Sequence, residues 1–264
     1  MTKKIKLLSI DLDGTLFKSN GTISSDAIGY INKCKELGYY IVYNTARPLK
    51  MIQQAFYKQF VDDYWVFSNG TTCFKSGKMI FHDAMYIMHI TELLEKLHND
   101  FSMYFFSVES HGEIYTTSGC EITNKKYYAE YEALSSIKGR DINKIIIIAE
   151  NRDFPTHEIT SLIHEETKLL VTEKGKYIQI MPVKASKLSA IERIIGQLGF
   201  GLSNVLAFGD DLNDLELIQA CGFGVAMGNA DNRIKECANY VTASNDDDGV
   251  SQFLRKTFFT KNLS

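Results

Sequence analysis

The sequence predicts an α/β fold: a Rossmann-like core with a parallel sheet, plus an inserted α+β domain, here called the cap. Short apolar runs alternate with amphipathic stretches up to residue 80. This pattern changes between residues 81 and 184, and the same alternation returns in residues 185–264. Alternating strands and helices favour a parallel sheet covered by helices. We therefore expect residues 1–80 and 185–264 to form the core and residues 81–184 to form the cap.

The first segment has the order β-α-β-α-β. Ser24 or Ser25 is a preferred helix N-cap, Gly38 a preferred helix end, and Pro48 suits a first helical turn. Apolar runs such as the first one are typical of buried strands. The expected elements are strand Ile5–Ile10, helix Ala27–Leu37, strand Tyr40–Tyr43, a helix after Pro48 through Phe56, and strand Tyr64–Phe67.

The middle segment begins with a hairpin over Cys73–Phe81 and then mixes strands with helices. Lys174-Gly175-Lys176 suits a hairpin turn between its last two strands. The expected strands are Ser102–Val108, Glu113–Thr116, Lys144–Ala149, Leu169–Glu173 and Tyr177–Met181, and the expected helices are Ile90–Leu97, Lys126–Leu134 and Thr156–Glu165.

The alternation of strands and helices seen in the first segment returns after Pro182. Ser186 can cap a helix that Gly199 ends, and a buried strand follows. The expected elements are helix Leu188–Leu198, strand Val205–Phe208, helix Asp214–Ala220, strand Gly224–Met227, helix Asp231–Cys237, strand Tyr240–Thr242 and a last helix after Asp246–Gly249.

Composition excludes several classes of protein. The chain has 264 residues, 45% hydrophobic and 23% charged, with a net charge of −3, so neither nucleic acid nor an anionic membrane is an expected partner. It shows no signal region and no apolar run of membrane-spanning length. The five cysteines are dispersed without a CxxC pair, which favours free thiols and a cytoplasmic location. We expect a monomer or a small homo-oligomer.

The most informative motif is Asp11-Leu12-Asp13-Gly14-Thr15, directly after the first strand. Two carboxylates this close repel each other, and their burial is costly without a compensating cation or proton. A site that holds Mg²⁺ and attacks phosphorus needs such a pair, because one carboxylate can be nucleophile and metal ligand while the other moves the proton.

Further polar side chains follow other strands of the core, and Lys187 stands at the start of a helix. The carboxyl ends of parallel strands meet at one crevice, so these groups can converge on Asp11. Several carboxylates, a hydroxyl and an ammonium are the groups that Mg²⁺-assisted phosphoryl transfer uses. The further candidates are Thr45, Lys187, Asp210, Asp211 and Asp214.

Each candidate has a plainer interpretation when taken alone. Asp11–Thr15 can be an ordinary turn, and Asp214 can be a helix cap. Lys184 lies close enough to Lys187 to take its place, although the spacing to the following apolar residues favours Lys187. The run Asp246–Asp248 suits the negative charge expected at a helix N-terminus better than a metal site.

Taken together, the motifs resemble one family. The segments are DLDGTL, NTAR, SNG, the helix that begins with Lys187, FGDDLND and GVAMGNA, in that order. This set resembles the haloacid dehalogenase superfamily, and more narrowly its Cof-type phosphatases with an inserted type IIB cap. Their order and spacing are far more specific than any one motif.

The resemblance implies roles for the matching residues. Asp11 is the expected nucleophile that forms an aspartyl-phosphate and binds Mg²⁺. Asp13 is the expected acid and base, with its backbone carbonyl on the metal. Lys187 is expected to neutralise the phosphoryl group and Asp11. The remaining expected roles are metal binding by Asp210, Asp211 and Asp214, and phosphate or substrate binding by Thr45, Ala46, Arg47 and Asn213.

Two positions depart from the family pattern. Ala46 stands where relatives usually carry glycine, and Asp211 where a small residue is common. The hydroxyl of Thr45 is kept, so the chemistry is unaffected, whereas the part of Asp211 in the metal shell stays open.

The expected activity is Mg²⁺-dependent hydrolysis of a small phosphorylated metabolite, with sugar phosphates as the first choice and nucleotide or cofactor phosphates, such as pyridoxal phosphate, next. Two alternatives remain. A phosphomutase or phosphotransferase would use the same nucleophile, and a phosphate sensor would bind its ligand without turnover.

Overall fold

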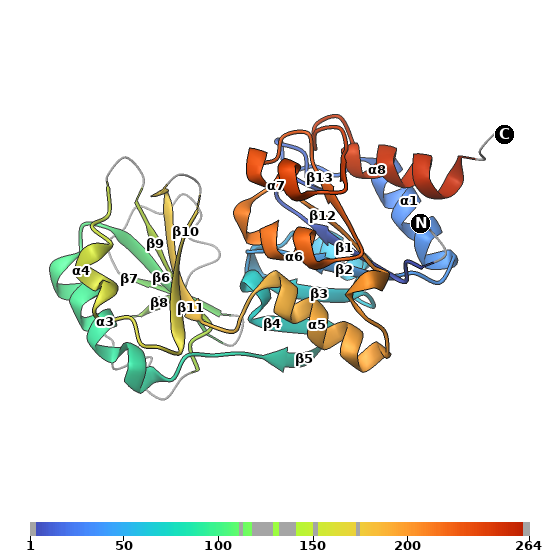
Figure 1. Cartoon of the computed structure of the whole chain (residues 1–264). Coiled ribbons are helices and arrows are strands. Elements are labelled where there is room, and N and C mark those ends of the chain that lie inside the picture. Colours follow the sequence, from blue (N-terminus) through green and yellow to red (C-terminus); the bar gives the residue numbers. More distant parts are fainter. Residues whose placement is uncertain are drawn as a thin grey trace. The chain divides into compact units, whose positions relative to one another are not determined.

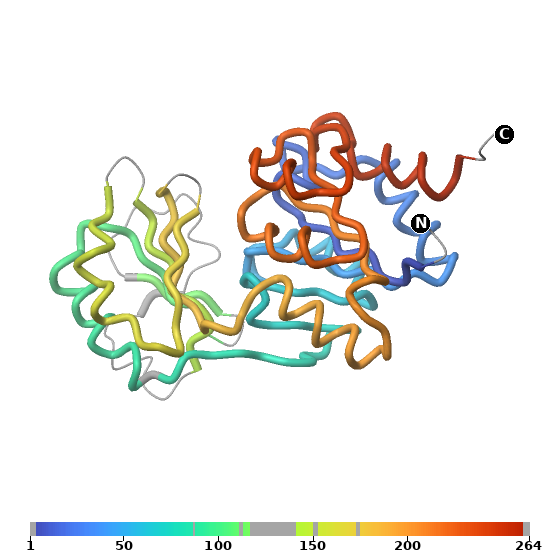
Figure 2. Tube along the Cα trace, in the orientation of Figure 1, coloured from blue at the N-terminus to red at the C-terminus, as the bar shows by residue number. Residues whose placement is uncertain are grey.

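The computed structural model describes residues 4–110, 113–117, 129–131, 141–149, 153–172 and 175–260. The chain folds into two compact units. Unit 1 consists of Met1–Ala46, Gln59–Ile80 and Ser186–Ser264, and unit 2 of Arg47–Lys58 and Phe81–Ala185. Figure 2 shows how the blue start and the orange-to-red end of the chain build unit 1 together.

Unit 1 contains an eight-stranded sheet in the order β14-β13-β12-β1-β2-β3-β4-β5 (Figure 1). The strands from β14 to β3 pair in parallel, and β4 pairs with β3 in the antiparallel direction. The strands are β1 (Leu7–Asp11), β2 (Tyr40–Asn44), β3 (Tyr64–Phe67), β4 (Thr72–Lys75), β5 (Lys78–His82), β12 (Val205–Gly209), β13 (Phe223–Ala226) and β14 (Tyr240–Val241).

Two groups of helices accompany this sheet. The helix α1 packs against α8, whereas α6 packs against both α5 and α7 (Figure 1). The helices are α1 (Ser25–Glu36), α5 (Lys187–Leu198), α6 (Leu215–Ala220), α7 (Asn232–Cys237) and α8 (Gly249–Leu254). Ser24 caps α1 and Ser186 caps α5, as the sequence predicts, because each side chain accepts a hydrogen bond from the first turn.

Unit 2 contains a six-stranded sheet in the order β10-β11-β9-β6-β7-β8, antiparallel except for the β7–β8 pair. A separate apolar core joins α3 to this sheet, with Leu94, Leu97, Phe106 and Ile147 among its buried members. The elements are α3 (Ile87–Asp100), β6 (Phe105–Ser110), β7 (Glu113–Thr117), β8 (Ala129–Tyr131), β9 (Lys144–Ile148), α4 (His157–Thr160), β10 (Thr167–Thr172) and β11 (Tyr177–Pro182).

The short segment Arg47–Lys58 also belongs to unit 2, although the sequence-based division keeps it with residues 1–80. An ion pair between Lys50 and Glu113 joins it to β7. The helix expected after Pro48 is interrupted here. A short 3₁₀ helix (Leu49–Met51) ends at Ile52, whose backbone is extended and whose side chain is buried, and α2 (Gln54–Gln59) follows.

Two further predictions for the cap need correction. The helix expected over Lys126–Leu134 is wrong at Ala129–Tyr131, which form β8 and pair in parallel with β7; the rest of that prediction lies outside the described residues. The helix expected over Thr156–Glu165 is limited to α4, because its C-terminal half forms the turns that lead into β10.

Two structural findings concern membrane-spanning helices and the cysteines. Within the described ranges, no helix combines the length and apolar character that crossing a membrane requires. Cys34, Cys73, Cys221 and Cys237 are free thiols, and Cys120 lies outside the described residues.

Candidate active site

The candidate active site lies where β1 ends. All five residues of β1 are buried, and the strand pairs with β12 on one side and β2 on the other. Asp11 is its last residue and is only 5% exposed, whereas Asp13 is half-buried in the loop that follows. The parallel order therefore places the Asp11 carboxylate in the middle of the sheet, at the edge where ligands bind in such folds.

Gly14 lets the loop after β1 approach Asp210. Its φ of +76° is in the left-handed region, and a Cβ atom there would lie 2.2 Å from the Asp210 Oδ2 atom. The neighbouring Thr15 hydroxyl donates a hydrogen bond of 2.9 Å to Asp210 Oδ1. Glycine followed by threonine thus joins the first motif to the carboxylate after β12.

Lys187 is the first residue of α5 and is 1% exposed. Its Nζ atom lies 2.6 Å from Asp11 Oδ1 and 2.6 Å from Asp214 Oδ1. The alternative, Lys184, is exposed. Helix α5 holds Lys187 in place because the backbone N–H of Ser189 donates to the Ser186 hydroxyl, and the Ser189 hydroxyl accepts from the Ser186 N–H.

Asp214 has partners for both of its carboxylate oxygens. Oδ1 accepts from Lys187, while Oδ2 accepts from the backbone N–H groups of Asp210 at 3.2 Å and Asp211 at 3.3 Å. This side chain therefore positions Lys187 and shapes the loop after β12. The Asp211 residue is only half-buried.

The carboxylates of Asp11, Asp210 and Asp214 outnumber the single ammonium of Lys187. Burial raises the pKa of Asp11 well above its ordinary value, although Lys187 opposes that shift and Asp214 adds to it. Burial and the Asp214 charge likewise raise the pKa of Asp210 to about 7. Burial lowers the pKa of Lys187, but the carboxylates of Asp11 and Asp214 outweigh it, so this ammonium stays charged. Two buried carboxylates contact one lysine, and the half-buried Asp210 adds a third carboxylate to the cluster, which favours a further cation.

The residues present fit Mg²⁺. Asp11, Asp210 and Asp214 each offer a carboxylate oxygen within 4.8 Å of the others. The buried Oδ2 atom of Asp11 has no hydrogen-bond partner among the described residues. Carboxylate oxygens are the ligands that this hard cation prefers. Since the Asp214 oxygens already have partners, Asp11 and Asp210 are the stronger candidates of the three.

The second and third strands bring polar groups to the same edge. The register pairs Asp11 with Asn44, so the next residue, Thr45, follows β2 directly, and it is fully buried. The Thr45 carbonyl accepts from the backbone N–H of Asn69 at 3.1 Å, and Asn69 Oδ1 accepts from Asn213 Nδ2 at 2.9 Å. Asn213 Oδ1 is buried without a partner in the described part of the chain.

Asn69 lies at the same edge of the sheet, beside Thr45 and Asn213. Neither its residue type nor its position in the sequence predicts a role for it. The motif Ser68-Asn69-Gly70 contributes to the family resemblance, but nothing local distinguishes one of its residues from an ordinary turn. All three have positive φ values, at 51°, 57° and 96°, and this backbone directs the Asn69 N–H to Thr45 and its amide oxygen to Asn213. Consecutive residues of this kind are costly and mark segments that the surrounding structure holds in place.

The two remaining predicted residues are near Thr45 in the sequence. Ala46 is half-buried at the end of its segment of unit 1, and Arg47 is exposed and belongs to unit 2. Their substrate-binding roles stay predictions.

C-terminal residues hold the loop that carries Asp13. Asn229 Nδ2 donates to the Gly14 carbonyl at 2.8 Å, and Asn245 Nδ2 donates to the Phe17 carbonyl at 2.9 Å. The backbone N–H of Asn245 also donates to Asn229 Oδ1 at 3.0 Å. The loop after β1 is therefore fixed by side chains more than 200 residues away in the sequence.

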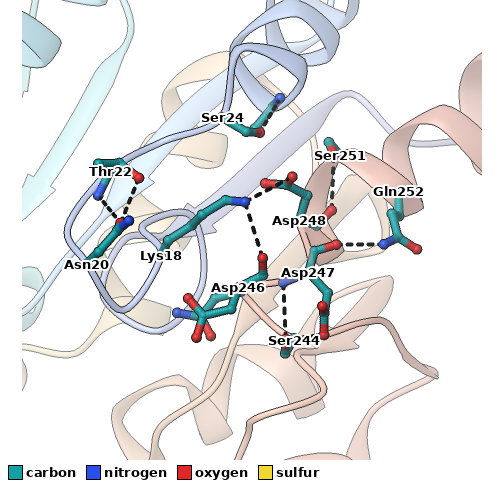
Figure 3. A network of polar contacts seen from close by, with 12 residues as sticks. Lys18, Asn20, Thr22, Ser24, Ser244, Asp246, Asp247, Asp248, Ser251 and Gln252 are labelled. Atoms are coloured by element: carbon teal, nitrogen blue, oxygen red, sulfur yellow. Dashed lines mark hydrogen bonds and ion pairs between the residues drawn. The ribbon is translucent and has the colours of Figure 1, made fainter.

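The acidic run Asp246–Asp248 continues this anchoring (Figure 3). Asp246 accepts from the Ser19 N–H and hydroxyl at 2.8 Å each, and Asp248 Oδ2 lies 3.1 Å from Lys18 Nζ. Asp248 is the N-cap residue of α8, but its side chain makes no capping hydrogen bond. Asp246 and Asp248 thus bind the loop after β1 through their side chains, whereas Asp247 accepts from the Ser244 hydroxyl.

Comparisons with known proteins identify the family. A family model for haloacid dehalogenase-like hydrolases matches residues 8–254. A 5-amino-6-(5-phospho-D-ribitylamino)uracil phosphatase of Bacillus subtilis (strain 168) is 27% identical over 253 residues, which cover 95% of this chain and 95% of the relative. A pyridoxal phosphate phosphatase of Escherichia coli (strain K12) is 25% identical over 269 residues, covering 94% and 97%.

A solved structure of similar fold is that of a subclass IIB sugar phosphatase of the same superfamily. It superposes with a TM-score of 0.81 at 22% identity and covers 95% of this chain and 98% of that one. The parallel sheet of unit 1 and the mostly antiparallel sheet of unit 2 match this architecture. The chain therefore belongs to the haloacid dehalogenase-like hydrolases and is a phosphatase of that superfamily.

Proposed function

We propose that this protein is a Mg²⁺-dependent phosphatase that hydrolyses small phosphorylated metabolites, with sugar phosphates as its preferred class, through a phosphorylated Asp11. One observation carries the proposal. Asp11 ends the middle strand of the sheet with one oxygen on Lys187 and the other buried and unpartnered among the described residues. A carboxylate held in this way has an orientation fixed by its lysine and an oxygen available for further chemistry.

In the first half-reaction, an Asp11 oxygen attacks phosphorus while the bond from phosphorus to the ester oxygen breaks. Asp13 gives its proton to the leaving alkoxide. In the second half-reaction, Asp13 takes a proton from water, the hydroxide attacks phosphorus, and the bond to Asp11 breaks to release phosphate. Asp11 and Asp13 are thereby restored to their starting states.

The neighbouring groups lower the charge repulsion in both steps. Lys187 places a buried ammonium beside Asp11, where it opposes the negative charge of the phosphoryl group. Asp11 and Asp210, with the Asp13 carbonyl, would hold Mg²⁺, which would supply further positive charge to the phosphoryl oxygens. The Thr45 hydroxyl and the Asn213 amide are the expected hydrogen-bond partners of those oxygens, and Asp211 is expected to support the metal directly or through water.

The substrate class rests on the relatives. The Bacillus subtilis relative is named for a phosphate carried by a ribityl chain, and the structural neighbour is a sugar phosphatase. Both names favour an ester on a polyhydroxylated chain. The pyridoxal phosphate phosphatase keeps a cofactor phosphate as the next candidate. Because fold and function separate readily in such families, the substrate must be measured.

The deciding experiment is phosphate release from sugar, sugar-alcohol, nucleotide and cofactor phosphates, with Mg²⁺ and with EDTA. Mg²⁺-dependent release that is fastest with a sugar or sugar-alcohol phosphate supports the proposal. A preference for nucleotide or cofactor phosphates overturns the substrate class alone. Transfer to a second hydroxyl without phosphate release would indicate a phosphomutase or phosphotransferase, and Mg²⁺-dependent binding without turnover would indicate a sensor.

The setting of the reaction is part of the same proposal. We propose a cytoplasmic enzyme that works as a monomer or a small homo-oligomer. The free cysteines support a reducing compartment, and burial raises the pKa of the Cys34 and Cys73 thiols to about 12, which keeps them unreactive. Size-exclusion chromatography with light scattering determines the oligomeric state directly.

A further inference from the structure

A second group of metal-binding side chains lies in unit 2 and has no part in the chemistry proposed above. His89 lies near the start of α3, and His164 and Glu166 lie in the turn before β10. The two imidazole rings are stacked, with centroids 3.6 Å apart and an angle of 13° between their planes. Glu166 Oε2 lies 3.5 Å from His89 Nδ1.

The turn that carries two of these residues is well fixed. The backbone N–H and the hydroxyl of Thr167 both donate to the His164 carbonyl at 2.8 Å, and the Glu166 N–H donates to His164 Nδ1 at 3.2 Å. His89 has its own support, because its backbone N–H donates to the Tyr86 carbonyl at 2.9 Å. Two segments distant in sequence therefore present their side chains to each other from ordered backbone.

The stacked pair calls for an electrostatic explanation. Two imidazolium cations at this separation repel each other, whereas two neutral rings each carry one nitrogen lone pair that a metal ion accepts. At His164 this lone pair is on Nδ1, so a bound metal ion would replace the 3.2 Å hydrogen bond from the Glu166 N–H. Glu166 adds a carboxylate close to the His89 Nδ1 atom. Two imidazoles and one carboxylate form a ligand set that zinc sites with an open fourth position use.

The distances permit a shared ion. One ligand atom from each residue lies within 4.8 Å of the other two. Ligand atoms about 2.1 Å from a tetrahedral zinc ion lie roughly 3.4 Å from one another. Closing the set therefore takes shifts of at most about 1.4 Å. Changes in side-chain torsions can supply them, because His89 and His164 are half-buried and Glu166 is exposed. The rings must also tilt so that their lone pairs converge.

We propose that His89, His164 and Glu166 form a binding site for a divalent transition-metal ion, with zinc as the best fit, on unit 2. Water completes the coordination. The site differs in kind from the cluster of Asp11, Asp210 and Asp214, which offers oxygen ligands alone. Imidazole nitrogen favours zinc, copper and nickel over magnesium, so the two sites sort two classes of metal ion.

Metal binding here joins the start of α3 to the start of β10. A ligand that binds only the folded state raises its stability. We expect zinc to slow hydrogen exchange in the first turns of α3 and in β10, while exchange in β1 and β12 of unit 1 stays unchanged.

The test uses the full chain, freed of metal by a chelator and then kept in millimolar Mg²⁺ to occupy the carboxylate cluster. Zinc is titrated by calorimetry, and Cu²⁺ is used for electron paramagnetic resonance, which detects nitrogen ligands. We expect one zinc equivalent to bind and the Cu²⁺ spectrum to show nitrogen coupling. His89→Gln and His164→Gln should each weaken zinc binding at least tenfold.

His98→Gln is the matched control, because His98 is exposed on the same helix and lies outside the cluster. This variant should bind zinc like the unaltered chain. Asp210→Asn should also keep the site, which separates it from the carboxylate cluster. Circular dichroism verifies that each variant folds. Absence of zinc binding, absence of nitrogen coupling, or undiminished binding by the His89→Gln/His164→Gln double variant overturns the proposal.

Discussion

At the scale of single residues, the position of Lys187 decides how Asp11 behaves. One ammonium contacts two buried carboxylates, and Asp210 lies within the same cluster. Buried ion pairs contribute little net stability, yet breaking one leaves a charge uncompensated in a medium that solvates it poorly. The chemistry of the site therefore depends on every member of the cluster, and a substitution that removes the only positive charge also lowers stability.

Asp11→Asn should lower turnover by about 10⁴-fold or more, because the amide is a poor nucleophile and binds metal weakly. The fold should persist, since the amide is isosteric with the carboxylate. Steady-state phosphate release and circular dichroism measure the two effects. Asp26→Asn, an exposed change in the first turn of α1, is the control for loss of a negative charge. Activity retained in Asp11→Asn would mean that another residue is the nucleophile.

Asp13→Asn should slow both half-reactions by about 10²–10⁴-fold, the usual contribution of a general acid and base. A substrate with a good leaving group, such as an aryl phosphate, needs less protonation. In Asp13→Asn, the first half-reaction should therefore slow less with the aryl phosphate than with an alkyl phosphate. Rapid-quench measurements of both steps test this contrast. Turnover of an alkyl phosphate close to that of the unaltered enzyme would remove Asp13 from the acid–base role.

Lys187→Gln should abolish most activity and lower the free energy of unfolding by about 3 kcal/mol at pH 7.5, because Asp11 and Asp214 would lose their buried counter-charge. Lys184→Gln is the matched control, since this lysine is exposed three residues earlier. Its stability should change by less than about 0.5 kcal/mol. Urea denaturation and phosphate release are measured on both. Equal effects in the two variants would contradict the assignment of Lys187.

At the scale of elements, the turn Ser68–Gly70 and the start of α5 depend on each other. A Cβ atom on Gly70 would lie 2.1 Å from the Ser186 carbonyl oxygen, next to Lys187. The same turn places Asn69 against Thr45 and Asn213. The close approach of the Gly70 and Ser186 backbones, rather than side-chain packing, therefore sets where α5 begins.

Gly70→Ala should lower the free energy of unfolding by more than the cost of placing alanine at a positive φ. The positive φ costs about 1 kcal/mol, and the clash with Ser186 should at least double this figure. Gly21→Ala is the control, because Gly21 also has a positive φ, at +78°, but its Cβ would meet nothing within 4 Å. Urea denaturation compares the variants, and activity should fall only in Gly70→Ala. Equal losses of stability would show that the backbone yields around Ser186.

The elements also show what the sequence can predict. The caps Ser24 and Ser186 and the buried apolar runs are local signals, which is why α1, α5 and the parallel strands agree with expectation. Parallel strands end on one edge, and for this reason Asp11 and Asp214, which follow β1 and β12, can be expected together without knowledge of their contacts. Lys187 begins a helix instead, and the family resemblance assigns it to the same site.

The rest depends on contacts that local sequence does not encode. Ala129–Tyr131 pair with β7, and this pairing overrides the helical pattern. The contacts of Asn69 follow from its positive φ, and those of Asn229 and Asn245 reach the loop after β1 from the other end of the chain. Such contacts become visible only when the whole fold is known.

At the scale of the whole molecule, unit 1 gathers carboxylates whose ionised forms are disfavoured by burial. The pKa of Asp210 is raised to about 7, above its value in the unfolded chain. A carboxyl group of this kind stabilises the folded state fully at low pH and loses that contribution as the pH rises through about 7. Mg²⁺ binds the ionised form and so opposes this loss.

We therefore expect the melting temperature in EDTA to fall between pH 5.5 and pH 8, and the increase caused by Mg²⁺ to grow over the same range. At 100 times its dissociation constant, the metal should contribute about 2.7 kcal/mol. Thermal unfolding with and without Mg²⁺ measures both effects, and Asp210→Asn should weaken the pH dependence. A stabilisation by Mg²⁺ that is greatest at pH 5.5 would contradict this expectation.

The way in which unit 1 is assembled from both chain ends has a consequence during synthesis. Asp11 and Lys187 are 176 residues apart, and Thr15 and Asp210 are 195 apart. At about 5–20 residues per second, roughly 10–40 s pass between the translation of these partners. Until β12 leaves the ribosome, β1 lacks its neighbour on one side. The long middle segment Phe81–Ala185 can collapse around its own apolar core within that interval. A nascent chain therefore carries its proposed nucleophile for most of its synthesis, and can become an enzyme only near the end of translation.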